Sequence, residues 1–137
     1  ITIRVLIIHG PNMNLLGLKN KDKQSTLTLD KINSKIKKEF RGSDYSLSIM
    51  QTHSESKAVS CLHQKRNKLD HIIISPGVWS INGYLIKETL EIIKIPFSIV
   101  LSSEYKNSIF DDIIPQEHVV TDNQYIDGYL QILKSLN

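Results

Sequence analysis

The stretch IRVLIIHGP, residues 3–11, decides the fold class of this chain. Five of its first six residues are apolar, and Gly10-Pro11 then ends the run. A short, continuous apolar run that is stopped by a turn signal is typical of a strand buried on both faces of a parallel sheet. We therefore expect residues 3–8 to form a central strand, with a turn directly after it.

Segments of strand and helix character alternate along the rest of the chain. Further strands are expected over residues 45–50, 71–74, 97–101 and 118–120. One helix is expected to begin after the N-cap Thr28, and a second is expected to run from a capping box of Thr52 and Glu55 to about residue 67. Two further helices are expected over residues 81–93 and 124–136. Strict alternation implies a parallel sheet with helices on both faces. The predicted fold class is therefore α/β, a flavodoxin-like doubly wound sheet of five parallel strands in the order 2-1-3-4-5.

Composition indicates one globular domain over residues 1–137, with 40% hydrophobic and 23% charged residues. The net charge is only +3, and the lysines of residues 31–38 lie at helical spacing, as on a solvated helix face. This pattern favours a domain that binds neither nucleic acid nor a membrane. No apolar run approaches the roughly 20 residues that span a bilayer. The single cysteine, Cys61, excludes an internal disulfide, and we expect a cytoplasmic protein with a buried thiol.

Polar or small residues follow four of the expected strands, at residues 9–14, 51–54, 75–78 and 102–104. In a doubly wound sheet, ligands bind outside the carboxyl ends of the strands, where the strand order reverses. Three of these segments precede a helix, whose first amides suit an anion. The sequence therefore predicts a small-molecule site around residues 9–12. No spacing of metal-ligating residues and no glycine-rich phosphate loop occurs, so we expect neither a metal nor a cofactor.

The segment GPNMNLLG, residues 10–17, resembles the signature GPNLNLLG of the type II 3-dehydroquinate dehydratases. The resemblance continues through residues 29–32, 51–55, 76–77 and 96–103, and so covers essentially the whole chain. It implies a cofactor-free trans dehydration of 3-dehydroquinate, in trimers that often assemble into a dodecamer. In that reaction a tyrosinate beside an Arg removes a proton alpha to the ketone. A water held by the signature Asn stabilises the enolate, and a His oriented by a Glu protonates the leaving hydroxyl.

Part of this machinery is retained in the chain. The resemblance places Asn12 at the position of the enolate water. It places Ser102 and Ser103 where backbone amides hold the substrate carboxylate. Glu88 replaces an Asp that reaches a neighbouring subunit.

Most of the reacting groups are replaced. Gln24 stands at the position of the base Tyr and Lys19 at that of its Arg, while Leu101 and Ile99 replace the acid His and its Glu. Ser75 and Ile81 replace substrate-binding Asn and His, and the closing Arg falls near Ser108 or Asp112. An amide cannot act as a base near neutral pH, and each lost proton-transfer group is worth roughly 10²–10⁴-fold.

These replacements predict a catalytically impaired or inactive homologue that still binds a small carboxylate as a homo-oligomer. One alternative is an active dehydratase or related lyase in which His53, Tyr84 or Tyr105 takes over, with His9 and Trp79 close to the site. A basic nucleic-acid-binding module is the other alternative.

Overall fold

The chain folds around one parallel β-sheet, seen in a computed structural model that describes residues 1–19, 27–105, 107–113, 118–121 and 125–136. The strands run in the order β2-β1-β3-β4-β5, and every neighbouring pair is parallel. Their bounds are β1 (Ile3–His9), β2 (Tyr45–Gln51), β3 (His71–Ser75), β4 (Phe97–Ser102) and β5 (His118–Thr121). The predicted α/β fold with a parallel sheet is confirmed, and the first four strands each extend one residue further than expected.

Strand β1 lies in the middle of the sheet because both of its faces are apolar. Ile7 pairs with Ile49 of β2 on one side and with Ile73 of β3 on the other. Residues 5–8 are at most 1% exposed. Burying each such side chain stabilises the fold by about 1.5–3 kcal/mol, so the opening apolar run places this strand at the centre.

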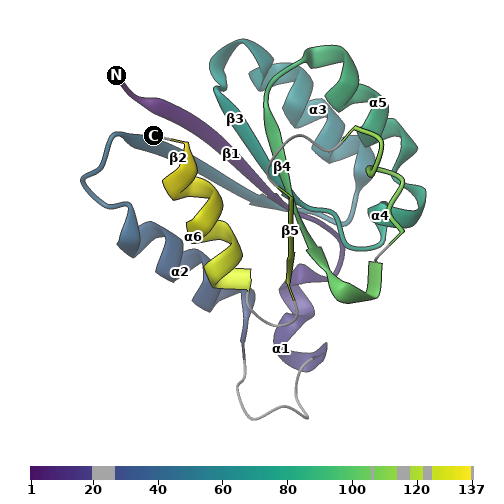
Figure 1. Cartoon of the computed structure of the whole chain (residues 1–137), viewed down its shortest axis with the longest axis horizontal. Coiled ribbons are helices and arrows are strands. Elements are labelled where there is room, and N and C mark those ends of the chain that lie inside the picture. Colours follow the sequence, from purple (N-terminus) through teal and green to yellow (C-terminus); the bar gives the residue numbers. More distant parts are fainter. Residues whose placement is uncertain (20–26, 106, 114–117, 122–124, 137) are drawn as a thin grey trace.

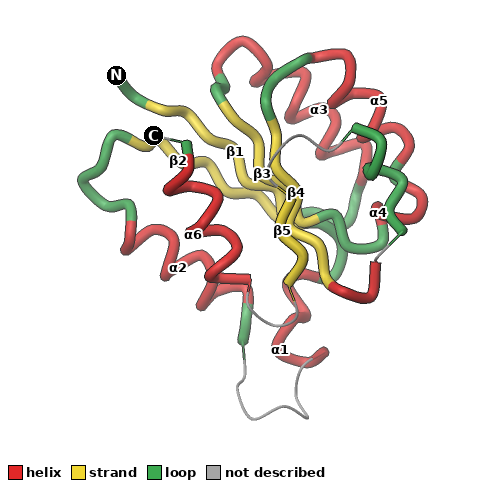
Figure 2. The backbone as a smooth tube through the Cα atoms, viewed as in Figure 1, coloured by secondary structure: helices red, strands yellow, loops and turns green. Residues whose placement is uncertain are grey.

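Two helices cover each face of the sheet (Figures 1 and 2). Helices α2 (Leu29–Glu39) and α6 (Tyr125–Ser135) pack together on one face, and α3 (Glu55–Lys65) and α5 (Tyr84–Ile93) on the other. Alternate residues of the strands therefore enter two separate cores. One core holds Ile7, Ile73 and Val100 with α2 and α6, and the other holds Ile8 and Leu101 with α3 and α5.

The predicted N-cap of the first long helix is confirmed, because the Thr28 hydroxyl accepts a hydrogen bond from the Lys31 amide at 3.2 Å. The predicted capping box at Thr52 is wrong. Ser54 caps α3 by accepting from the Lys57 amide at 3.2 Å, and the Thr52 hydroxyl accepts from the Ser54 amide. Glu55 instead reaches the neighbouring helix, where its carboxylate accepts from the Ile86 amide at 3.0 Å.

The expected helix over residues 81–93 is two helices, α4 (Trp79–Asn82) and α5, which meet at Gly83. The Gly83 amide donates to the Trp79 carbonyl at 2.7 Å. A Cβ at position 83 would lie 2.7 Å from the Trp79 Cβ, so only glycine permits this approach. The described residues also form the short helical segments η1 (Met13–Leu15), α1 (Leu16–Lys19), η2 (Arg66–Lys68) and η3 (Ser103–Tyr105).

The expectation of a buried thiol is also corrected, because Cys61 is half-buried. Tyr84, named above as a possible substitute for a replaced reacting group, is 64% exposed on α5. Within the described residues, none of the helices has both the length and the apolar character required to cross a bilayer.

Candidate functional site

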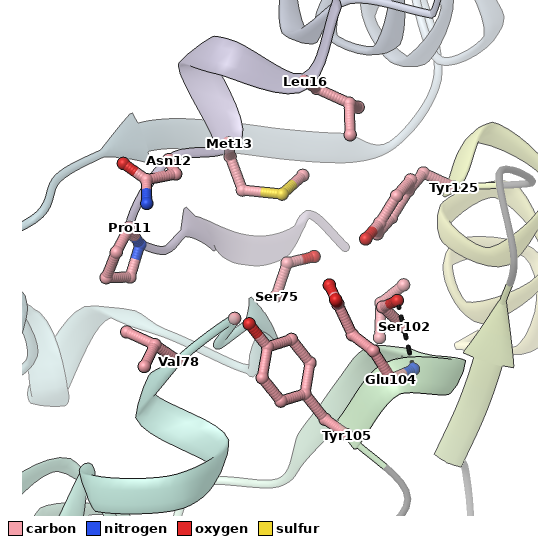
Figure 3. A pocket seen from close by; sticks show the side chains of 12 residues that line it. Pro11, Asn12, Met13, Leu16, Ser75, Val78, Ser102, Glu104, Tyr105 and Tyr125 are labelled. Carbon is pink, nitrogen blue, oxygen red and sulfur yellow. Dashed lines mark hydrogen bonds between the residues drawn. The ribbon is translucent and has the colours of Figure 1, made fainter. Parts of the chain in front are cut away.

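A cavity of about 190 Å³ opens at the carboxyl ends of β1, β3 and β4, close to the signature loop (Figure 3). The residues that line it come from the loop and η1, from the segments after β3 and β4, and from α6. They are Pro11, Asn12, Met13, Leu16, Ser75, Gly77, Val78, Val100, Ser102, Glu104, Tyr105 and Tyr125. The cavity therefore lies where the sequence predicts a small-molecule site.

The signature loop, residues 10–12 after β1, is held by hydrogen bonds to the ends of β2 and β3, the two strands that flank β1. The Gly10 amide donates to the Ser75 carbonyl at 2.8 Å, and a Cβ on Gly10 would lie only 2.7 Å from that oxygen. The Gln51 side-chain amide donates to the Gly10 carbonyl at 3.2 Å. His53 accepts from the Asn12 amide through Nδ1, also at 3.2 Å. These bonds join the ends of β1, β2 and β3 and hold Asn12, whose backbone is left-handed at φ 66°.

Polar side chains reach the cavity from several directions. Asn12 comes from the loop, Ser102 from the end of β4, Glu104 and Tyr105 from η3, and Tyr125 from α6. Figure 3 shows the Glu104 carboxylate and the two tyrosine hydroxyls directed into the cavity. The Ser102 hydroxyl accepts from the Glu104 amide at 3.5 Å. Among the lining residues that the structure describes, Glu104 is the only one with a charged side chain, and none is a histidine.

Three of the predicted site residues meet at this cavity, namely Asn12, Ser75 and Ser102. Leu101 and Ile99 do not reach it. They are 2% and 0% exposed and lie in the core beneath α3 and α5, on the opposite face of the sheet. Because side chains alternate along a strand, β4 offers Val100 and Ser102 to the cavity instead.

The other predicted residues lie around the rim or apart from the cavity. Ile81 is 59% exposed on α4, and Glu88 is exposed on α5. Ser108 is buried and its hydroxyl accepts from the Phe110 amide at 3.1 Å. Asp112 forms an ion pair with Lys87 at 2.9 Å. Gln24 and the side chains of Lys19 and Ser103 lie outside the residues that the structure describes.

A chain of buried polar groups runs from the cavity into the core. The Ser75 hydroxyl is hydrogen-bonded to the Tyr129 hydroxyl, which lies 3.0 Å from His9 Nδ1. His9 Nε2 lies 2.9 Å from the Asn33 side-chain oxygen. Ser75, His9 and Tyr129 are at most 1% exposed. Burial lowers the pKa of His9 to about 4, with the bond to Asn33 opposing that shift, and burial raises the pKa of Tyr129 above its usual range.

Several of these residues are not evident as site residues in the sequence. Tyr125 and Tyr129 are expected only as part of the helix over residues 124–136, which gives no sign that they reach a site. Glu104 belongs to the polar segment 102–104 that is expected at the ligand-binding edge of the sheet, although no role is predicted for its carboxylate. A signal exists for His9, because it ends an apolar strand and its ring has to find partners if it is buried.

Comparison with known proteins identifies the family from the sequence, and comparison with solved structures identifies the shared fold. Residues 3–112 match the family described as dehydroquinase class II. The 3-dehydroquinate dehydratase of Caldanaerobacter subterraneus subsp. tengcongensis is 34% identical over 93 residues, which are 68% of this chain and 63% of that protein. That of Clostridium botulinum (strain 657 / Type Ba4) is 34% identical over 103 residues, covering 74% of this chain and 70% of the relative.

Two solved structures share the fold. The type II dehydroquinase from Butyrivibrio crossotus DSM 2876 superposes with a TM-score of 0.83 at 19% identity, covering 99% of this chain and 98% of that one. A 3-dehydroquinate dehydratase-like protein from Bifidobacterium longum superposes with a TM-score of 0.70 at 16% identity, covering 98% and 94% of the two chains. The family match over most of the chain, the 34% identity to these relatives and the shared fold establish that this chain belongs to the type II dehydroquinase family.

Proposed function

We propose that this chain is a ligand-binding member of the type II dehydroquinase family whose dehydratase activity is strongly reduced or lost. The observation that carries the proposal is the environment of Leu101 and Ile99. Both occupy positions that the family resemblance gives to the acid His and its Glu, and both pack into the core on the far side of the sheet. An alkyl side chain can transfer no proton. Leu101 and Ile99 are at most 2% exposed, so this part of β4 is closed to solvent.

The described lining of the cavity supports the same conclusion. Dehydration needs a base for the proton alpha to the ketone and an acid for the leaving hydroxyl. The titratable side chains in the lining are Glu104, Tyr105 and Tyr125. No imidazole or guanidinium lies among the described lining residues to activate them. Losing two proton-transfer groups slows a reaction by roughly 10⁴–10⁸-fold if each is worth 10²–10⁴-fold.

The ligand that we propose is a small hydroxylated carboxylate. Asn12, Ser75 and Ser102 provide hydroxyl and amide groups around a cavity of about 190 Å³. The Glu104 carboxylate opposes a second negative charge beside it. The hydroxyl-bearing side of the ligand is therefore expected to face Glu104 and Ser75, with its carboxylate directed away from the Glu104 side chain.

A second candidate is a slow dehydratase that uses substitute residues. The observation in its favour is that two phenols and a carboxylate, from Tyr105, Tyr125 and Glu104, are directed into the cavity (Figure 3). If one of them acts as a base, then Tyr105→Phe, Tyr125→Phe or Glu104→Gln abolishes the residual rate. If the residual rate survives all three substitutions, this candidate fails.

Calorimetric titration with 3-dehydroquinate, paired with absorbance of the conjugated enone product, tests the proposal. Binding without product formation is the expected outcome. Binding with rapid product formation would show an active dehydratase. Absence of any binding would remove the ligand-binding function, and Ser102→Val serves as a control that removes one polar group from the cavity.

We also propose that the chain associates with further copies of itself through α5. Leu85 and Ile92 are 48% and 66% exposed, and Glu88 lies between them at helical spacing. Tyr84 adds a further exposed ring at 64%. A trimer in sedimentation experiments that dissociates in Leu85→Glu is the expected result, whereas a monomeric wild-type protein would contradict this assembly.

A further inference from the structure

We infer that His9 and Tyr129 are positioning residues that fix the direction of the Ser75 hydroxyl, so that Ser75 accepts a hydrogen bond from a hydroxyl group of the bound ligand. The inference deepens the proposed function and rests on it, because it concerns the ligand of the same cavity. Ser75 lines the cavity, whereas His9 and Tyr129 are fully buried behind it and are not among its described lining residues.

The donor and the acceptor of each hydrogen bond in the buried series can be assigned by starting from Asn33, the group farthest from the cavity. The Asn33 side-chain oxygen can only accept, so His9 Nε2, at 2.9 Å, carries the hydrogen. A neutral imidazole has one N–H, which leaves Nδ1 as an acceptor. The Tyr129 hydroxyl, 3.0 Å from Nδ1, therefore donates to it.

The hydrogen bond between Tyr129 and Ser75, the last of this buried series, then has only one possible direction. The single hydrogen of the Tyr129 hydroxyl is already committed to His9, so its oxygen accepts from Ser75. The Ser75 hydroxyl hydrogen points into the core, and the lone pairs of its oxygen remain for the cavity. A ligand group that meets Ser75 must donate, as a hydroxyl does and a ketone or carboxylate does not.

The same series of hydrogen bonds could instead transfer a proton away from Ser75 and make it a nucleophile, but the surroundings of His9 argue against this. Activation would move the Ser75 proton to Tyr129 and the Tyr129 proton to His9, and would leave a charged imidazolium. His9 is fully buried and its far partner is the neutral amide of Asn33 rather than a carboxylate. Burial also lowers the pKa of His9 to about 4. A positioning role needs no charge at any of these groups.

The tautomer of His9 is the first readout, and it does not depend on a ligand. We expect nitrogen NMR of the labelled wild-type protein at pH 7 to show a neutral His9 with the proton on Nε2. A merely structural histidine could adopt either tautomer. A proton on Nδ1, or an imidazolium, would overturn the inference, because the direction of every following bond would reverse.

The second readout is selectivity between two probes, 3-dehydroquinate and cyclohexanecarboxylate, which carries the carboxylate but no hydroxyl. Without Tyr129 the Ser75 hydrogen is free to turn toward the cavity, so Tyr129→Phe should weaken 3-dehydroquinate binding about tenfold relative to cyclohexanecarboxylate. The matched control is Tyr45→Phe, which removes a tyrosine hydroxyl that donates to the Leu133 carbonyl of α6, outside the cavity. It should leave the ratio unchanged.

The outcomes separate this inference from the proposed function. Equal weakening of both probes in Tyr129→Phe would mean that Tyr129 has only a structural role. If Tyr129→Phe proves too unstable to titrate, Ser75→Ala is expected to lower the same ratio about tenfold, and an unchanged ratio would overturn the inference. If the wild-type protein binds neither probe, the proposed function fails, and the His9 tautomer alone then decides whether the buried chain runs in the stated direction.

Discussion

Acidification should destabilise this protein through one buried histidine, His9. Its imidazole is 0% exposed, and burial lowers its folded-state pKa to about 4 from an ordinary value of 6.5. Because the folded-state value is the lower one, the unfolded chain binds more protons between pH 6.5 and pH 4. The stability associated with neutral His9 is therefore fully present above pH 6.5 and is lost as the pH falls. At 1.36 kcal/mol per unit, the loss is about 2 kcal/mol by pH 5 and about 3 kcal/mol by pH 4.

Urea unfolding followed by circular dichroism between pH 7.5 and pH 4 measures this loss. The carboxylates titrate over the same range, so the informative quantity is the difference between the wild-type protein and His9→Gln. As the pH falls from 7.5 to 4, the wild-type protein should lose about 3 kcal/mol more of its free energy of unfolding than His9→Gln does. His63→Gln, at an exposed position, is the matched control and should follow the wild type. A difference between wild type and His9→Gln that stays constant with pH would show that His9 titrates alike in the folded and unfolded chains.

Three further substitutions test the fold and the site. Gly10→Ala places a Cβ 2.7 Å from the Ser75 carbonyl and should lower the free energy of unfolding by about 1–3 kcal/mol in urea titrations; an unchanged midpoint would show that the loop can move away. Ser54→Ala removes the cap of α3 and should cost about 1 kcal/mol, more than Lys57→Ala on the same helix does. Leu101→His should restore no dehydratase activity in the enone assay and should lower the melting temperature, because its ring enters the core under α3 and α5; recovered turnover would mean that position 101 can face the cavity.

The parts of the fold that are predictable from the sequence depend on local patterns. The continuous apolar run of β1 by itself indicates a strand buried on both faces, as the structure shows. Thr28 caps α2 through the amide of Lys31, only three residues away. The division of the expected helix into α4 and α5 at Gly83 is harder to predict from the sequence, because it depends on how closely the backbone approaches Trp79. Thr52 and Ser54 are both plausible caps in sequence, and only the path of the chain after β2 selects Ser54.

The location of the candidate site follows from topology, whereas its contents depend on long-range packing. Strand ends and polar turns predict where a cavity lies, and Asn12, Ser75 and Ser102 line the one observed there. The face that Leu101 presents depends on which helices cover which side of β4. The Tyr129 hydroxyl meets Ser75 across 54 residues of sequence, a contact that no local pattern indicates.

Steady-state turnover of 3-dehydroquinate measures directly whether the chain has lost dehydratase activity. Purified protein is mixed with 3-dehydroquinate near neutral pH, and the absorbance of the conjugated enone is followed beside an active type II dehydroquinase. We expect a rate at least about 10⁴-fold below that of the active enzyme, because both proton-transfer groups are missing. A rate comparable to that of the active enzyme would show that the chain is an active dehydratase and that the replacements at Leu101 and Ile99 do not matter for catalysis.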